Sequence, residues 1–255
     1  MPLTDEQLER YARHIVLREI GGAGQKRLLG AHVAVVGAGG LGCPAIAFLA
    51  AAGVGTIRVI DPDIVSLSNL QRQILYGTAD IGRPKAEAAQ SAVARINPDV
   101  HLVAINQRLD ADNAAVLLRD VDVILDGCDN FETRLAVSDA ATALRIPLVT
   151  AAVGVFDGQV GLWRGWEASQ PCYRCLVGAD PARPDMNCAD QGIVGAVTGT
   201  IGSMAALEVI RALVPFGEEM AGQMLIADFL SRRFRTVRVA ADAACPACAV
   251  ESVIA

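Results

Sequence analysis

The alternation of short β-branched runs with helical segments over residues 31–152 restricts the fold of this chain more than any other feature. Each run is apolar on both faces, as a strand must be when helices cover both sides of its sheet. The runs are HVAVVG, TIRVID, VHLVAI, VDVILD and PLVTAA, and helices are expected between them at 41–53, 84–96, 112–119 and 131–144. This pattern predicts a doubly wound, mainly parallel α/β sheet.

The pattern changes after residue 152. Three antiparallel strands and one long helix are expected there, at 155–165, 222–228, 233–240 and 193–213. Near the start, Thr4 and Gln7 form a capping box for a helix that we expect to end at Gly21-Gly22. The sequence has no internal repeat and no Pro- or Ser-rich linker, so we expect a single domain over 1–255.

Composition excludes several classes of protein. Hydrophobic residues make up 53% of the chain and charged residues 20%, which excludes a disordered protein. The net charge of -6 disfavours nucleic acid as a partner. Residues 33–56 are uncharged, but six glycines and Pro44 interrupt them, so we expect no membrane span. The acidic N-terminus differs from a secretory signal, and we expect a cytoplasmic protein.

A glycine-rich turn, GAGGLG at 37–42, lies between the first expected strand and its helix, and Asp61 ends the next strand. In this setting the glycines let the backbone approach phosphate, the helix amides face the anion, and the acid can hold ribose hydroxyls. The turn therefore predicts an adenosine nucleotide site. The alternative is a tight turn whose glycines serve packing alone.

Five further motifs accompany this turn: RYAR at 10–13, DPDIVSLSNLQRQ at 61–73, RPK at 83–85, DGCDN at 126–130 and CYRC at 172–175. Taken together over nearly the whole chain, they resemble the ThiF/MoeB family, the bacterial relatives of ubiquitin-activating enzymes. The chain departs from the common family pattern at Ala38, where a larger residue is usual, and at Gly127, where the family has cysteine.

The resemblance implies a Rossmann-like fold and ATP-dependent adenylation of the C-terminal Gly-Gly carboxylate of a small ubiquitin-like sulfur-carrier protein, with release of pyrophosphate. It divides the domain into a helical segment at 1–30, a nucleotide-binding core at 31–152, and a carrier-binding, zinc-bearing part at 153–255. It implies ATP and magnesium as cofactors and a homodimer as the catalytic unit. The nucleotide-binding residues it implies are Gly37, Gly39, Gly40, Gly42, Asp61, Asp63, Asn69, Arg72, Gln73, Lys85, Asp129 and Asn130.

The resemblance also assigns roles. Asp61 holds the ribose, Asp129 coordinates magnesium, Arg13 reaches the ATP of the other subunit, and the phosphates meet Asn69, Arg72, Gln73 and Lys85. The chemistry agrees, because an ionised carboxylate attacks the α-phosphate without a general base and needs only cations, a metal and amides around it.

Each role has a structural alternative. Arg72 and Lys85 can be solvated surface charges, and Asp129 can cap the helix that begins near Asn130. Arg13 lies on an amphipathic helix whose polar face would carry arginine in any case.

The cysteines predict a metal site. Cys172 and Cys175 form one CxxC pair, and Cys245 and Cys248 form a second, which together supply the four thiolates of a closed zinc site. Zinc would clip the tail onto the body, and we expect this clip to lie away from the glycine-rich turn. The alternatives are metal-free reduced thiols or a redox pair. Two other cysteines, at 43 and 128, are expected to be small buried residues.

Cys188 precedes the long helix, where amides can lower the pKa of a thiol. In the family, a cysteine at this place can accept the activated carrier covalently. The chain ends seven residues after Cys248, so we expect a separate sulfur donor, a cysteine desulfurase or sulfurtransferase. The carriers for thiamine thiazole and for molybdopterin both fit; residues 71–75 and 83–85 are more similar to the thiamine branch.

Two other functions compete with adenylation. An NAD-dependent oxidoreductase would use the same glycine turn and Asp61, but the sequence lacks a YxxxK pair and has no well-placed histidine. A non-catalytic scaffold usually loses its arginine, lysine or metal-binding aspartate, which this chain keeps at Arg72, Lys85 and Asp129.

Overall fold

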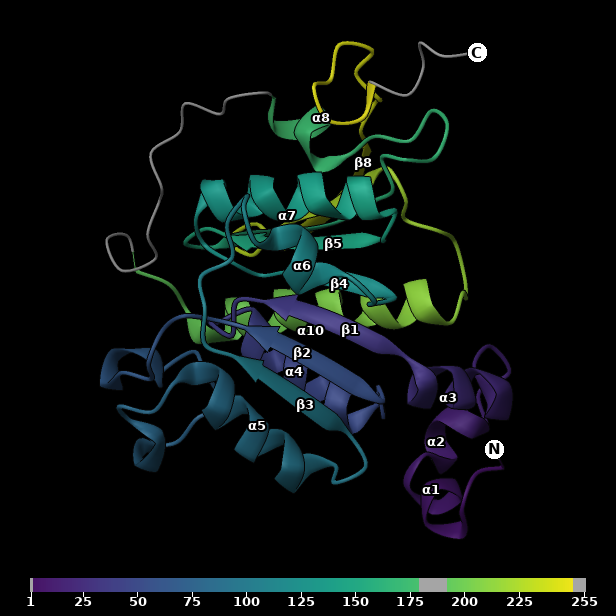
Figure 1. Cartoon of the computed structure of the whole chain (residues 1–255), viewed down its shortest axis with the longest axis vertical. Helices are drawn as coiled ribbons and strands as arrows, with labels where there is room; N and C mark the ends of the chain where they lie inside the picture. The colour runs from purple at the N-terminus through teal and green to yellow at the C-terminus, as the bar shows by residue number, and fades with distance from the viewer. Residues whose placement is uncertain (1, 179–191, 250–255) are drawn as a thin grey trace.

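Eight strands form one sheet in the order β3-β2-β1-β4-β5-β6-β7-β8 (Figure 1). The structure is a computed structural model that describes residues 2–178 and 192–249. The strands are β1 His32–Val36, β2 Thr56–Ile60, β3 His101–Ile105, β4 Val123–Asp126, β5 Leu148–Val153, β6 Asp157–Trp163, β7 Gln223–Asp228 and β8 Arg233–Arg238. β1 to β5 pair in parallel, and β6 to β8 extend the sheet antiparallel. The predicted fold class is confirmed.

Helices cover both faces of the sheet. The main ones are α4 Gly42–Ala51, α5 Lys85–Ile96, α6 Ala114–Leu118, α7 Phe131–Leu144 and α10 Gly195–Leu213. In Figure 1, α7 lies in front of the sheet and α10 behind it. Val33 and Val35 of β1 belong to the core under α4 and α10, whereas Ala34 and Val36 belong to the core under α7. Two buried faces are the reason that the strands are apolar throughout.

The N-terminal segment differs from the single helix that the sequence predicts. It forms α1 Asp5–Arg10, which begins at the predicted capping box of Thr4 and Gln7, then α2 Ala12–Ile15 and α3 Gly21–Gly30. The chain bends at Tyr11, which is buried and accepts a hydrogen bond from the Asn97 side chain. The expected end at Gly21-Gly22 is therefore wrong, because a long-range contact breaks the helix and Gly21 begins another.

The helix α10 is long and apolar enough to cross a membrane by length and composition alone. Half of its most apolar window is buried inside this fold, where it packs against α4, β5 and β6. These contacts are those of a core helix.

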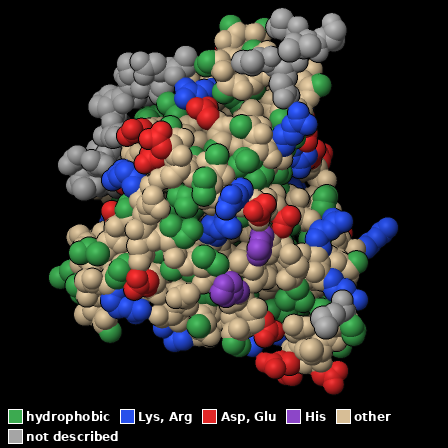
Figure 2. Space-filling model, viewed as in Figure 1, with side chains coloured by type: hydrophobic (Ala, Val, Ile, Leu, Met, Phe, Trp, Pro, Cys, Tyr) green, Lys and Arg blue, Asp and Glu red, His purple; other side chains and the backbone are tan. Residues whose placement is uncertain are grey.

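The surface carries charges of both signs. Acidic and basic side chains are interspersed on the face shown in Figure 2, in keeping with 22 basic and 28 acidic residues. The net charge of -6 is therefore spread over a surface that carries both signs.

Candidate functional site

A cavity of about 830 Å³ opens at the carboxyl ends of the parallel strands. The helix that follows β1 packs on one face of the sheet and the helix that follows β4 on the other, so these neighbouring strands mark the topological switch point. Open α/β sheets bind their ligands in the crevice at this point. The loops after β1, β2, β4 and β5 line the cavity.

The glycine-rich turn forms one wall of the cavity. Gly37 has φ +89°, and a Cβ there would lie 3.1 Å from the Cys128 backbone, so the turn requires glycine. A Cβ on Gly39 would enter the cavity with only Gln73 within 4 Å. Gly42, in contrast, does not line the cavity; a Cβ there would overlap the Gly37 carbonyl. Gly42 thus has a packing role between helix and strand, and its contact with nucleotide stays a prediction.

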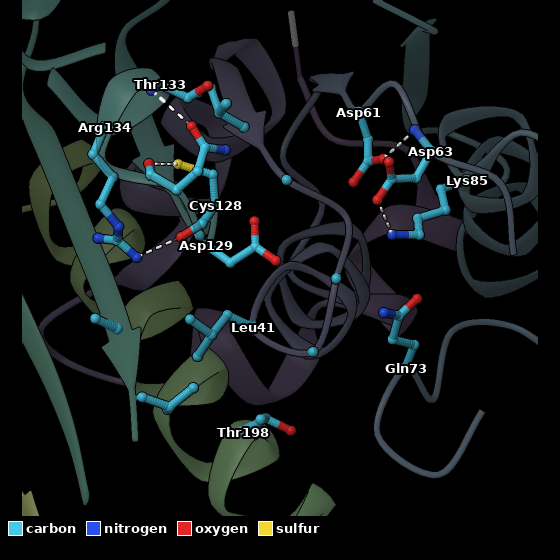
Figure 3. A pocket seen from close by; sticks show the side chains of 18 of the residues that line it. Leu41, Asp61, Asp63, Gln73, Lys85, Cys128, Asp129, Thr133, Arg134 and Thr198 are labelled. Atoms are coloured by element: carbon cyan, nitrogen blue, oxygen red, sulfur yellow. Dashed lines mark hydrogen bonds and ion pairs between the residues drawn. The ribbon is translucent and has the colours of Figure 1, made fainter. Parts of the chain in front are cut away.

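Asp61 is buried beside the turn. Its carboxylate accepts a hydrogen bond from the Ala38 amide (2.7 Å). It accepts a second one from the Asp63 amide (2.9 Å), which Figure 3 shows. Burial raises the pKa of Asp61 above its ordinary value, while Lys85 and these two amides act in the opposite direction. The carboxylate is thus fixed at the end of β2, at the place where ribose hydroxyls bind in Rossmann-like sheets.

The segment after Asp61 brings cationic and amide side chains to the same cavity. Lys85 Nζ lies 2.7 Å from Asp63 Oδ2, and the lysine side chain is only 8% exposed. Lys85 is therefore not a solvated surface charge. Arg72 donates from Nη1 to the Ser68 carbonyl and also lines the cavity, together with Asn69.

Gln73 points into the cavity with an unsatisfied group. It is 3% exposed, and its Oε1 is buried without a hydrogen-bond partner among the described residues. A buried polar atom of this kind usually has a partner in the working molecule. An amide carbonyl beside an open glycine turn fits a bound nucleotide.

Asp129 and Asn130 follow β4. Asn130 caps α7, since its Oδ1 accepts a hydrogen bond from the Thr133 amide (2.9 Å). The capping alternative for Asp129 is therefore wrong. Asp129 is exposed and lines the cavity, which leaves its carboxylate oxygens accessible to a hard cation.

Arg134 is the main residue that sequence reasoning missed. It is buried in the cavity wall, where Nη1 lies 3.4 Å from Asp126 Oδ2 and Nη2 donates to the carbonyls of Cys128 and Ala151. A cation in the first turn of α7 opposes the helix dipole. That conflict is a signal in the sequence that Arg134 has a fixed partner.

Four cysteines form a second site. The Sγ atoms of Cys172, Cys175, Cys245 and Cys248 lie within 4.8 Å of one another. Neighbouring Sγ atoms are separated by 3.4 to 3.9 Å. A regular tetrahedron with Zn–S of about 2.3 Å has S···S edges of about 3.8 Å, so these thiols match a structural metal site.

None of the four clustered cysteines lines the nucleotide cavity, but a neighbour of Cys172 does. Cys172 directly precedes α8 Tyr173–Val177, and the C-terminal segment meets α8 at one end of the molecule (Figure 1). Tyr173, the next residue, lines the same cavity as the glycine turn.

Four other predicted residues have different outcomes. Arg13 lies exposed on α2 and does not line the cavity of its own chain. Cys188 lies outside the described residues. Cys43 is buried as predicted, and burial raises the pKa of its thiol to about 12, which makes it unreactive. Cys128 is half-buried in the cavity wall, and burial raises its pKa also.

The fold and the cavity define a Rossmann-like nucleotide-binding protein with cationic, amide and carboxylate side chains at its switch point. The sequence profile of the ThiF family matches residues 11–247, and the chain belongs to this family.

Relatives cover nearly the whole chain. It is 42% identical to the sulfur carrier protein adenylyltransferase of Thermus thermophilus, over 98% of this chain and 94% of the relative. It is also 42% identical to the sulfur carrier protein ThiS adenylyltransferase of Escherichia coli, over 96% of this chain and 97% of that relative. A solved structure of E. coli MccB with ATP superposes with a TM-score of 0.81 at 21% identity, over 94% of this chain and 74% of that chain, and shows the same fold.

Proposed function

We propose that this protein uses magnesium and ATP to adenylate the C-terminal Gly-Gly carboxylate of a small ubiquitin-like sulfur-carrier protein, releasing pyrophosphate. The observation that carries the proposal is the set of side chains gathered in one cavity with the glycine turn. They comprise Asp61, Asn69, Arg72, Gln73, Lys85 and Asp129.

These residues suit phosphoryl chemistry without an acid or base. Asp61 holds the ribose, while Lys85 and Arg72 orient the phosphates and offset the charge that develops as the carboxylate attacks. Lys85 is already oriented by Asp63, so little reorganisation is needed when phosphate binds. The cavity continues past Asp129 along Ala152, Val153 and Gly154. Such small residues suit a tail that carries no side chains.

Two metal ions belong to the proposal. Magnesium, held by Asp129, supplies charge neutralisation on the triphosphate, and the exposed carboxylate fits this role. Zinc, held by Cys172, Cys175, Cys245 and Cys248, supplies a structural cross-link between the body and the C-terminal segment.

Partners follow from the same chemistry. The carrier ends in Gly-Gly, a separate sulfur donor acts on the adenylate, and the cytoplasmic homodimer is the working unit. Among relatives, identity is 42% to the adenylyltransferase named for ThiS and 40% to MoeZ of Mycobacterium tuberculosis, whose length this chain covers to 63%. We assign the chain to the thiamine branch on the segments at 71–75 and 83–85.

Exchange of labelled pyrophosphate into ATP tests the function. Exchange that depends on magnesium and on a Gly-Gly-ended carrier is the expected result, and a carrier lacking its terminal glycines is the matched control. Reduction of NAD without exchange would establish the oxidoreductase instead. A protein that does neither would be a scaffold.

Cys188 is proposed to act after adenylation. The carboxylate attacks phosphorus directly, so Cys188→Ala leaves pyrophosphate exchange unchanged. The variant loses a reductant-sensitive covalent adduct with the carrier and forms thiocarboxylate more slowly. Thiocarboxylate formation at the wild-type rate would show that the donor attacks the adenylate without this thiol.

A further inference from the structure

Aromatic and polar contacts connect the residue that follows Cys172 with the wall of the nucleotide cavity. Tyr173 is the first residue of α8, directly after Cys172, and it is 4% exposed. Its ring packs edge-to-face on Trp163 at 5.9 Å between centroids, and Trp163 Nε1 donates to Thr150 Oγ1 (2.8 Å). Tyr173 thus has a fixed position between the sheet and the cavity.

The hydroxyl of Tyr173 continues the contact into α7. Tyr173 and Arg134 line the same cavity, and the Arg134 cation acts against the burial that raises the pKa of the Tyr173 hydroxyl. Arg134 Nη2 in turn donates to the Cys128 and Ala151 carbonyls at 2.5 and 2.7 Å. Figure 3 shows Arg134 directed at the loop that carries Cys128 and Asp129. This loop is short, and Asp126 Oδ1 accepts the Cys128 amide at its base (3.0 Å).

A second contact holds the same two helices together. Arg174 of α8 forms a bidentate pair with Asp139 of α7, with distances of 2.7 and 2.8 Å. Bidentate guanidinium–carboxylate pairs fix orientation as well as distance. α8, which contains Cys175 and directly follows Cys172, is therefore oriented against α7 at two points.

We infer that Tyr173 and Arg134 are positioning residues, through which the metal-bound cysteine cluster fixes the Asp129 loop of the nucleotide cavity. The inference rests on the proposed function. Without a metal, α8 loses the cross-link to the C-terminal segment, the Tyr173–Arg134 contact loosens, and the carbonyl of Cys128 loses its anchor. Asp129 then no longer has one fixed position at the cavity.

Linkage makes the inference measurable without an activity assay. If metal at the cysteines favours binding of magnesium and ATP, then magnesium and ATP must favour the metal by the same factor. We expect a factor of about ten, within the usual range for coupled sites. Zinc affinity, measured by competition with a chromophoric chelator, rises about tenfold when magnesium and ATP are added.

Two variants test the route. Tyr173→Phe keeps the ring against Trp163 and all four thiols but removes the hydroxyl, so its zinc affinity changes about twofold or less on adding magnesium and ATP. Thr142→Val is the control, because it removes one hydrogen bond of α7, to the Ser138 carbonyl, away from the cavity. Thr142→Val keeps the roughly tenfold rise in zinc affinity that the wild type shows on adding magnesium and ATP. If Tyr173→Phe does not bind zinc, Arg134→Lys is used as the test variant in its place. Lysine keeps the positive charge beside Asp126 but cannot reach every acceptor of Arg134, so the same small change in zinc affinity is expected.

The outcomes are distinct. Wild-type protein that exchanges pyrophosphate but shows the same zinc affinity with and without magnesium and ATP overturns the link and leaves the proposed function intact. An equal rise in zinc affinity in the wild type and in Tyr173→Phe also overturns the link between the two sites. Failure to bind magnesium and ATP at all overturns the proposed function and the link with it.

Discussion

At the scale of single residues, Arg72 and Asp129 give the sharpest test of the site. Both line the cavity, and neither caps a helix nor fills the core. Arg72→Ala and Asp129→Ala each lose at least about 100-fold in pyrophosphate exchange, roughly 2.7 kcal/mol of transition-state stabilisation. Their unfolding midpoints in urea stay near that of the wild type. Full exchange by both variants would contradict the site assignment.

Asn130 is the neighbouring comparison. Its side chain caps α7, so Asn130→Ala lowers the free energy of unfolding by about 1 kcal/mol. Asp129→Ala does not, because Asp129 leaves the cap to its neighbour. Urea unfolding followed by circular dichroism measures both. Equal destabilisation by the two variants would mean that Asp129 also supports the helix.

Because of Asp61, the affinity for magnesium and ATP is expected to depend on pH. Burial raises the pKa of Asp61 in the free protein, and ribose hydroxyls need the ionised form as acceptor. Affinity for magnesium and ATP is therefore complete above this pKa and falls as the pH drops through it, beginning above the ordinary aspartate value of about 3.9. The ratio of wild-type to Asp61→Asn affinity at each pH removes the titration of the nucleotide itself. A ratio that stays constant with pH would exclude this role.

At the scale of elements, the strands can be predicted from the sequence because their burial on both faces requires continuous apolar runs. β1, β2 and β5 lie where the apolar runs place them, since both faces of each strand are covered. The break at Tyr11 is not predictable, because it depends on Asn97 and Gly53, which are distant in sequence. Most predicted nucleotide-site residues line the cavity for a similar reason: they follow strands whose ends meet at one edge.

The contacts of Arg134 are the part of the site that the sequence does not reveal. Its acceptors are mainly backbone carbonyls, and a carbonyl carries no residue-specific signal in a sequence. The same holds for the unsatisfied Gln73 Oε1, which only the packed structure distinguishes from a solvated amide.

The cysteine cluster belongs to the scale of elements, because it joins α8 to the C-terminal segment. We expect purified protein to contain about one zinc per chain and the double variant Cys175→Ser with Cys248→Ser to contain none. Cys43→Ala, a buried cysteine outside the cluster, keeps its zinc. Loss of the cross-link lowers the free energy of unfolding by roughly 4 kcal/mol, the chain-entropy value for a loop of about 70 residues. Stoichiometric zinc in the double variant would place the ligands elsewhere.

At the scale of the whole molecule, the proposed homodimer predicts where Arg13 acts. Arg13 is exposed on α2 and does not line the cavity of its own chain, although its motif belongs to the nucleotide-binding family pattern. We therefore expect it to serve the cavity of a second copy. In a symmetric dimer, each of the two cavities would then combine Asp129 of one subunit with Arg13 of the other.

Mixed dimers test whether Arg13 of one subunit serves the cavity of the other. Arg13→Ala and Asp129→Ala homodimers each lose most pyrophosphate exchange, but a mixture refolded to equilibrium regains about a quarter of the wild-type rate, because half of the dimers have one intact site. The control mixes Arg72→Ala with Asp129→Ala. Both residues line the same cavity of one chain, so no dimer in that mixture has an intact site and exchange stays low. No recovery in the Arg13 mixture would place Arg13 outside the partner's site. Recovery in the control would instead contradict the placement of Arg72 and Asp129 in one cavity of the same chain.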